Sequence, residues 1–179
     1  MLPQQQRRQF LKYWVGGALG SVAWGFLRPM ASPSRAVDLE ALCTATPLNA
    51  RCKDYLPGVQ ARDRNNKPLL AKQLLSTSTP GLPVRVQGLP EKKIAYLVIT
   101  QGPKLAEYAI RPICSHQGCT VDWNAEIKRF ICPCHGAQFD NQGQVFKGPA
   151  KRALPLVTVV VKQDQVRLVD RAPAKDPRG

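Results

Sequence analysis

Short runs of apolar and β-branched residues, separated by glycine and proline, recur through most of the chain. The runs cover residues 84–86, 96–100, 108–110, 130–131, 156–161 and 166–169. This spacing predicts short strands joined by turns, because glycine and proline interrupt helices whereas β-branched side chains suit a pleated sheet. A short helix or turn is expected between 63 and 75. The pattern therefore predicts a mostly β protein, with a small antiparallel β domain over 61–170.

The first apolar run, 10–27, has a different pattern. It is continuous, rich in glycine and alanine, and contains a single charge at Lys12. At about 1.5 Å per residue this length is close to the lower limit for crossing the hydrocarbon layer, so Lys12 would have to reach towards the headgroups. We expect one N-terminal apolar helix here, with 1–28 forming a signal or transmembrane anchor.

The residues before this run carry an export pattern. Arg7 and Arg8 precede Phe10-Leu11-Lys12, which resembles a twin-arginine export signal. A stop-transfer anchor whose arginines follow the positive-inside rule is the alternative, and the two interpretations are compatible. Residues 34–36 (Ser-Arg-Ala) would also serve as a cleavage site. Retention and cleavage of the helix therefore both stay open.

Composition narrows the function classes. The chain has 179 residues, 44% of them hydrophobic, with 16 prolines and 13 glycines, which suits one core and argues against a helical bundle. Its 26 basic and 12 acidic residues give a net charge of +14. Such an excess favours acidic proteins or anionic headgroups as partners. No nucleic-acid partner is expected, because the basic residues are scattered without interleaved aromatic residues.

Residues 29–60 are expected to form a linker and a cysteine-bearing segment. Cys43 and Cys52 lie there, with no histidine nearby. A local disulfide would stabilise the segment by up to ~3 kcal/mol, and two unpaired buried thiols are the alternative. At the other end, 171–179 is expected to be a polar, frayed tail.

Two short stretches contain the candidate chemistry, and both histidines of the chain lie in them. The residues are Cys114, His116 and Cys119 in the first stretch and Cys132, Cys134 and His135 in the second. Each stretch offers a thiolate and an imidazole, and the four donors together would suit a structural zinc ion. Two further cysteines, Cys119 and Cys134, would then be redundant, which argues against zinc.

The pattern Cys-x-His-x-x-Cys followed by Cys-x-Cys-His-Gly resembles the signature of Rieske iron–sulfur proteins. The resemblance implies one [2Fe-2S] cluster, with Cys114 and Cys132 on one iron and His116 and His135 on the other. It also implies a cluster-binding loop subdomain and a mixed ligand set of higher potential than four cysteines give. In this family the exposed histidines accept a proton with the electron and contact the hydroquinone.

Further roles follow from the same resemblance. It implies a disulfide between Cys119 and Cys134 that joins the two loops over the cluster. Gly148 and Pro149 resemble the family's proline loop, a third loop that shields the cluster from water.

The residues around these motifs are similar to the Rieske subunit of cytochrome b6f complexes, over roughly 61–169 and the twin-arginine head. This similarity implies an electron-transfer subunit of an oxidoreductase. It would take an electron from plastoquinol and pass it to a c-type cytochrome, beside the membrane subunits of the complex. The head would be membrane-anchored on the exported side, in the thylakoid lumen or the periplasm.

Departures from the family pattern keep other functions open. High-potential members carry a serine and a tyrosine whose hydroxyls donate to cluster sulfurs, where this chain has Ala137 and Phe139. Losing both donors is expected to lower the potential. A glycine-rich hinge is also missing. The alternatives are a lower-potential Rieske protein of the periplasm or plasma membrane, a small subunit feeding a periplasmic metalloenzyme, and a zinc-stabilised binding module.

Overall fold

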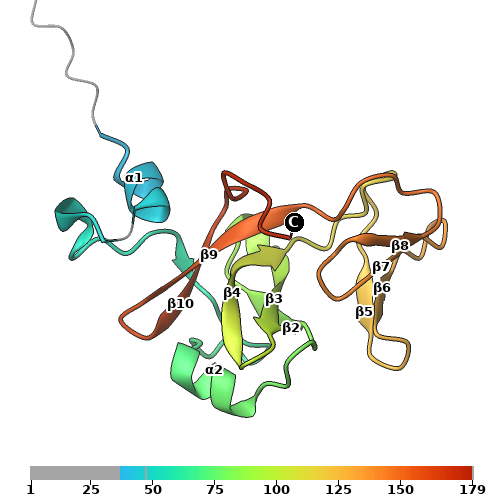
Figure 1. Ribbon diagram of the computed structural model, residues 1–179, viewed down its shortest axis with the longest axis horizontal. Coiled ribbons are helices and arrows are strands. Elements are labelled where there is room, and N and C mark those ends of the chain that lie inside the picture. Colours follow the sequence, from blue (N-terminus) through green and yellow to red (C-terminus); the bar gives the residue numbers. More distant parts are fainter. Residues whose placement is uncertain (1–36, 47, 179) are drawn as a thin grey trace, which may run out of the picture. The chain divides into compact units, whose positions relative to one another are not determined.

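The computed structural model of the chain describes residues 37–46 and 48–178 (Figure 1). One set of strands comprises β1 (Val59–Gln60), β2 (Val84–Gln87), β3 (Ile94–Thr100), β4 (Lys104–Ile110), β9 (Leu156–Lys162) and β10 (Gln165–Val169). A second set comprises β5 (Asp122–Asn124), β6 (Arg129–Ile131), β7 (Gln138–Phe139) and β8 (Val145–Lys147). The sheet orders are β1-β10-β9-β4-β3-β2 and β5-β6-β7-β8, and all pairings are antiparallel. The prediction of a mostly β, antiparallel fold is confirmed.

Strand β3 of the larger sheet is covered on both faces, which explains its continuous apolar run from Ile94 to Ile99. In β3, Leu97 and Ile99 belong to one buried cluster and Tyr96 and Val98 to another, as the two-residue period of a strand requires. The second cluster also contains Phe130 from the smaller sheet. A fully buried side chain of this kind contributes roughly 1.5–3 kcal/mol. The second cluster therefore joins the smaller sheet to one face of the larger sheet.

The helices are short: α1 (Leu39–Ala45), η1 (Ala50–Cys52), α2 (Ala71–Thr77) and η2 (Pro90–Lys92). The helix or turn expected between 63 and 75 is in fact a turn followed by α2. Asp63 fixes the turn by accepting hydrogen bonds from two backbone N–H groups at 2.8 Å. The first turn of α2 is held by Asp164, whose carboxylate accepts from the N–H of Lys72 at 3.0 Å. A partner so distant in sequence cannot be identified from local propensity.

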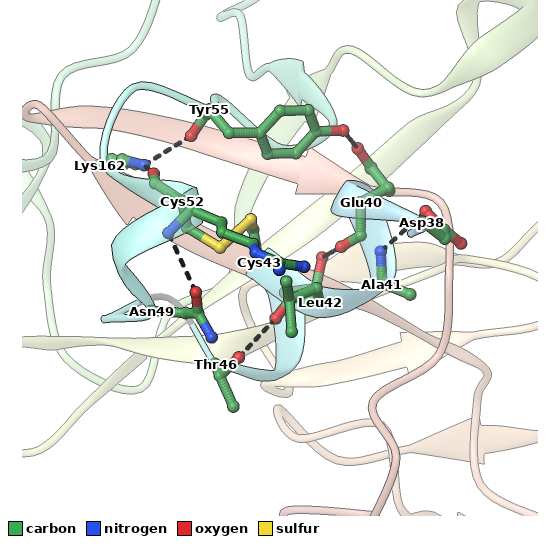
Figure 2. Close-up of a disulfide and its surroundings, with 12 residues drawn as sticks. Asp38, Glu40, Ala41, Leu42, Cys43, Thr46, Asn49, Cys52, Tyr55 and Lys162 are labelled. Atoms are coloured by element: carbon green, nitrogen blue, oxygen red, sulfur yellow. Dashed lines mark hydrogen bonds between the residues drawn. A yellow bond between two sulfur atoms is a disulfide. The ribbon is translucent and has the colours of Figure 1, made fainter. Parts of the chain in front are cut away.

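The cysteine-bearing segment contains two short helices (Figure 2). Asp38 begins α1 by accepting from the N–H of Ala41 at 3.1 Å, an ordinary N-cap. Cys43 of α1 is disulfide-bonded to Cys52 of η1, with a Cα–Cα distance of 5.4 Å. Both cysteines are buried. The disulfide thus joins two short helices that are too short to be stable alone.

Side chains of the larger sheet hold this segment in place. The Lys162 ammonium on β9 donates to the backbone carbonyls of Cys52 and Tyr55, the latter at 2.6 Å (Figure 2). Glu40 accepts from the Tyr55 hydroxyl at 2.5 Å and from the Gly58 N–H at 2.9 Å. That bond to the Glu40 carboxylate raises the pKa of the Tyr55 hydroxyl. Residues 37–46 and 48–58 therefore pack as part of the domain.

The polar C-terminal tail is mostly exposed, and it contacts the domain through Arg178. The Arg178 side chain is 5% exposed, donates to the Leu154 carbonyl at 3.0 Å and pairs with Asp176 at 2.6 Å. Thr158 on β9 donates its N–H to the carbonyl of Arg171 at 2.8 Å. An arginine in a polar tail can thus attach the tail to the domain by donating to a backbone carbonyl. The apolar helix expected within 1–28 lies outside the described residues, and no helix among the described ones is long and apolar enough to cross a membrane.

Candidate metal centre

Three loops meet at one end of the smaller sheet. The first loop, 114–119, lies between β4 and β5, the second, 132–137, joins β6 to β7, and the third, 148–153, follows β8. The hydroxyl of Ser115 donates to the carbonyl of Arg152, which ties the first loop to the third. The strands of the smaller sheet lie between these loops in the sequence, and their pairing brings the candidate residues together in space.

The first two loops share a backbone design. The N–H of Gly118 donates to the carbonyl of Cys114 at 2.8 Å, and that of Gly136 donates to the carbonyl of Cys132 at 3.0 Å. Both glycines have positive φ, +77° and +68°, a conformation that side chains disfavour. A glycine four residues after each cysteine is therefore a requirement of the turn, and the spacing is visible in the sequence.

The thiols of Cys114 and Cys132 are free and almost completely buried, at 2% and 1% exposure. Burial raises the pKa of Cys114. Burial acts in the same direction on Cys132, but backbone N–H groups, first that of Cys134, and a hydrogen bond with Cys114 outweigh it and lower its pKa. Backbone N–H groups of the following residues face both sulfurs. Such donors stabilise sulfur in its anionic, metal-binding form.

The two histidines lie on the solvent side of the loops. The side chains of His116 and His135 are exposed, and their ring centroids are 4.9 Å apart with the planes at 88°. The site therefore has an inner pair of thiols and an outer pair of imidazoles.

The remaining two cysteines join the loops. Cys119 and Cys134 form a disulfide with a Cα–Cα distance of 6.6 Å. Their sulfurs and that of Cys132 lie within 4.8 Å of one another. Because Cys119 and Cys134 are bonded to each other, they are not available as metal ligands, and the bond holds the second loop against the first.

The third loop packs on the second. A Cβ added at Gly148 would lie 2.8 Å from the Cα of Ala137, so only glycine allows this approach. Pro149, the next residue, is exposed. Ala137 and Phe139 are fully buried, and both belong to the cluster that contains the two free cysteines. The apolar residues at these two positions therefore contact the interior of the site rather than solvent.

The donor set fits a [2Fe-2S] cluster. Two thiols facing backbone N–H groups and two exposed imidazoles are the donors that a mixed cysteine and histidine cluster uses. The sequence motif did not indicate Ser115, whose hydroxyl links two of the loops. A lone serine inside a metal motif carries no signal of its own.

Comparison with known proteins agrees with this chemistry. Residues 72–163 match the family described as Rieske [2Fe-2S] domain. The chain is 34% identical to the cytochrome b6-f complex iron-sulfur subunit of Synechococcus sp. (strain CC9605), over 92% of this chain and 85% of that protein. The corresponding subunit of Trichodesmium erythraeum (strain IMS101) is 33% identical over 92% and 84%. Among solved structures, the plasma membrane Rieske protein of Synechocystis PCC 6803 is 31% identical, covering 55% of this chain and 93% of that one with a TM-score of 0.42.

Proposed function

This chain belongs to the Rieske [2Fe-2S] domain family of electron carriers, and we propose that it is the subunit that accepts an electron from plastoquinol in a cytochrome b6f-type membrane complex and delivers it to a c-type cytochrome. The observation that carries the proposal is the 34% sequence identity to a b6-f iron-sulfur subunit, in an alignment that covers 92% of the chain. The match extends well beyond the cysteine and histidine loops, which argues for likeness of the whole subunit.

The proposed ligands divide between the two sides of the site. We assign Cys114 and Cys132 to one iron, because their sulfurs are buried and face backbone N–H groups. We assign His116 and His135 to the other iron, because their rings are adjacent and exposed. When bound, the cluster supplies a one-electron redox step.

The protein residues supply access, protons and exclusion of water. In this proposal His116 and His135 present their outward ring nitrogens to the quinol, so that a proton can be held there as the electron is taken up. The Cys119–Cys134 disulfide keeps the loops closed. Gly148 and Pro149 bring the third loop over the second, which limits water near the buried thiols.

A second candidate function follows from Ala137 and Phe139. Both side chains are buried beside the free cysteines and neither has a hydroxyl to donate. Donors at these places would stabilise the more negative reduced cluster, so their absence favours a lower potential. The second candidate is therefore a lower-potential Rieske protein of the periplasm or plasma membrane, serving another redox chain or a sensing role.

A redox titration of the holoprotein, followed by EPR, separates the two candidates. We expect a midpoint well above that of the plastoquinone pool, and reduction of the oxidised protein by a short-chain plastoquinol. A midpoint near that of the pool favours the second candidate. Failure of the quinol to reduce the protein, with the EPR signal intact, would overturn the b6f-type assignment.

A further inference from the structure

Three exposed basic residues, Lys147, Lys151 and Arg152, border the candidate metal centre, and we call them the basic flank. Lys147 on β8 pairs with Gln138 at the start of β7, directly after the second loop. The carbonyl of Arg152 accepts from Ser115 in the first loop. The basic flank is thus attached to both loops that carry the histidines.

The charge of the basic flank is not neutralised locally. Residues 114–121, 132–139 and 145–153 contain these three basic residues and no acidic one. Within 37–46 and 48–178, none of the three basic residues forms an ion pair. Attraction to a partner's carboxylates is therefore not diminished by a neighbouring acid.

The nearest acidic residues along these strands are Asp140, whose carboxylate accepts hydrogen bonds within a turn, and Asp122, which lies far from the basic flank. Asp140 accepts from the N–H groups of Gln142 and Gln144 at 2.9 Å each, which directs its carboxylate into a turn. Asp122 is on β5 at the opposite edge of the smaller sheet from Lys147. Three strand spacings of about 4.8 Å separate these edges, longer than a Debye length of about 8 Å at physiological salt.

An exposed aromatic residue lies beside the flank. Phe146 is 57% exposed, and the guanidinium of Arg129 lies over its ring, 4.0 Å from the centroid. Val145, its neighbour, is 38% exposed. Aromatic and arginine side chains are enriched in the centres of protein interfaces, where a rim of charge sets orientation. An exposed aromatic side chain with basic neighbours suits a folded protein better than a small anion.

We propose that the basic flank and Phe146 form the docking surface for an acidic electron-transfer protein, which is thereby brought next to His116 and His135. This inference rests on the proposed function, since it assumes that electrons leave at the histidines. One electron passes from the reduced protein to a ferric haem of the partner, which becomes ferrous. The basic flank raises the rate of encounter with an acidic partner and disfavours a basic one.

The test uses one haem protein in two charge states: a basic mitochondrial c-type cytochrome and the same protein with its lysines succinylated, which is acidic. Reduced full-length holoprotein is mixed with each in a stopped-flow instrument at several ionic strengths. We expect the acidic form to react faster at low ionic strength, by about tenfold or more, with the advantage lost as salt is added. The double variant K151E/R152E should remove most of this advantage.

The matched control is R51E/K53E, which makes the same change of charge at two exposed residues of the N-terminal segment, outside the three loops. It should leave the rates near those of the unmodified protein. A second readout does not depend on electron transfer: carbodiimide crosslinking of the acidic cytochrome, read by mass spectrometry, should join its carboxylates to Lys147 and Lys151.

The outcomes separate the inference from the proposed function. Equal rates with both cytochromes, or equal effects of K151E/R152E and R51E/K53E, would overturn the docking surface while leaving electron transfer intact. Reduction of neither cytochrome would count against the proposed function, and the crosslinks would still decide the docking site. If K151E/R152E instead weakens only the binding of phosphatidylglycerol vesicles, the flank binds lipid and the inference is wrong.

Discussion

Removing the Cys43–Cys52 disulfide, by Cys43→Ala with Cys52→Ala, should loosen the N-terminal segment while leaving the metal centre intact. The disulfide closes a loop with a sequence separation of 9. In the chain-entropy description, a crosslink over a loop of this size lowers the entropy of the unfolded segment. Without the crosslink, the free energy of unfolding the segment should fall by about 2.5–3 kcal/mol. Since each ~1.4 kcal/mol is a factor of ten, local opening should become roughly a hundredfold more frequent.

Amide hydrogen exchange measures this opening residue by residue. The N–H groups of Thr46, Asn49 and Tyr55 donate within the segment, to carbonyls at 2.8, 3.0 and 3.2 Å. Their exchange should accelerate by about two orders of magnitude in the double variant, whereas amides of β3 and β4 should keep their rates. Leu48→Ala is the matched control, because Leu48 lies in the closed loop and is 99% exposed.

Two results would refute this reasoning. If protection falls equally in the segment and in β3 and β4, the disulfide stabilises the whole domain rather than one segment. If protection does not change at all, Lys162 and Glu40 hold the segment without help from the disulfide.

Three further predictions concern the metal centre. Ala137→Ser and Phe139→Tyr should each raise the midpoint potential of the holoprotein by several tens of millivolts, at about 1 kcal/mol or more per hydrogen bond and 59 mV per ~1.4 kcal/mol. A combined change under about ten millivolts in a redox titration would show that these hydroxyls do not tune the protein. Cys119→Ala should speed loss of the visible absorption on warming, because the link to Cys134 is lost, without changing the EPR line shape of freshly prepared protein. Gly148→Ala should also speed that loss, since the new Cβ would lie 2.8 Å from a backbone atom; unchanged stability would show that the third loop can move away.

The strands of the larger sheet were the most predictable part of the fold. The runs 84–86, 96–100, 156–161 and 166–169 all lie within observed strands, because β-branched residues between turns are a strong local signal. The strands of the smaller sheet have two or three residues each, too few for a two-residue period to be detected. The pattern indicated only β6 among them.

At the metal centre, the spacing of cysteine and histidine in the sequence identified the residues that lie together in the structure. It did not indicate the hydrogen bonds that hold the loops and the N-terminal segment in place. The paired stretches around Cys114 and Cys132 indicated the thiols and imidazoles. The bond from Ser115 to the third loop joins residues 37 positions apart. The two Lys162 bonds that anchor the N-terminal segment join residues 110 and 107 positions apart. Contacts at such separations depend on the complete fold, so no local pattern could have predicted them.

The central claim is that Cys114, Cys132, His116 and His135 hold one [2Fe-2S] cluster. Pulsed EPR of the reduced holoprotein, with iron and labile sulfide measured on the same sample, tests it most directly. We expect two irons and two sulfides per chain, a low average g value, and strong coupling of the unpaired electron to two histidine nitrogens. His116→Ala should abolish the native signal. Zinc in place of iron with no labile sulfide, or a cluster without nitrogen coupling, would contradict the claim.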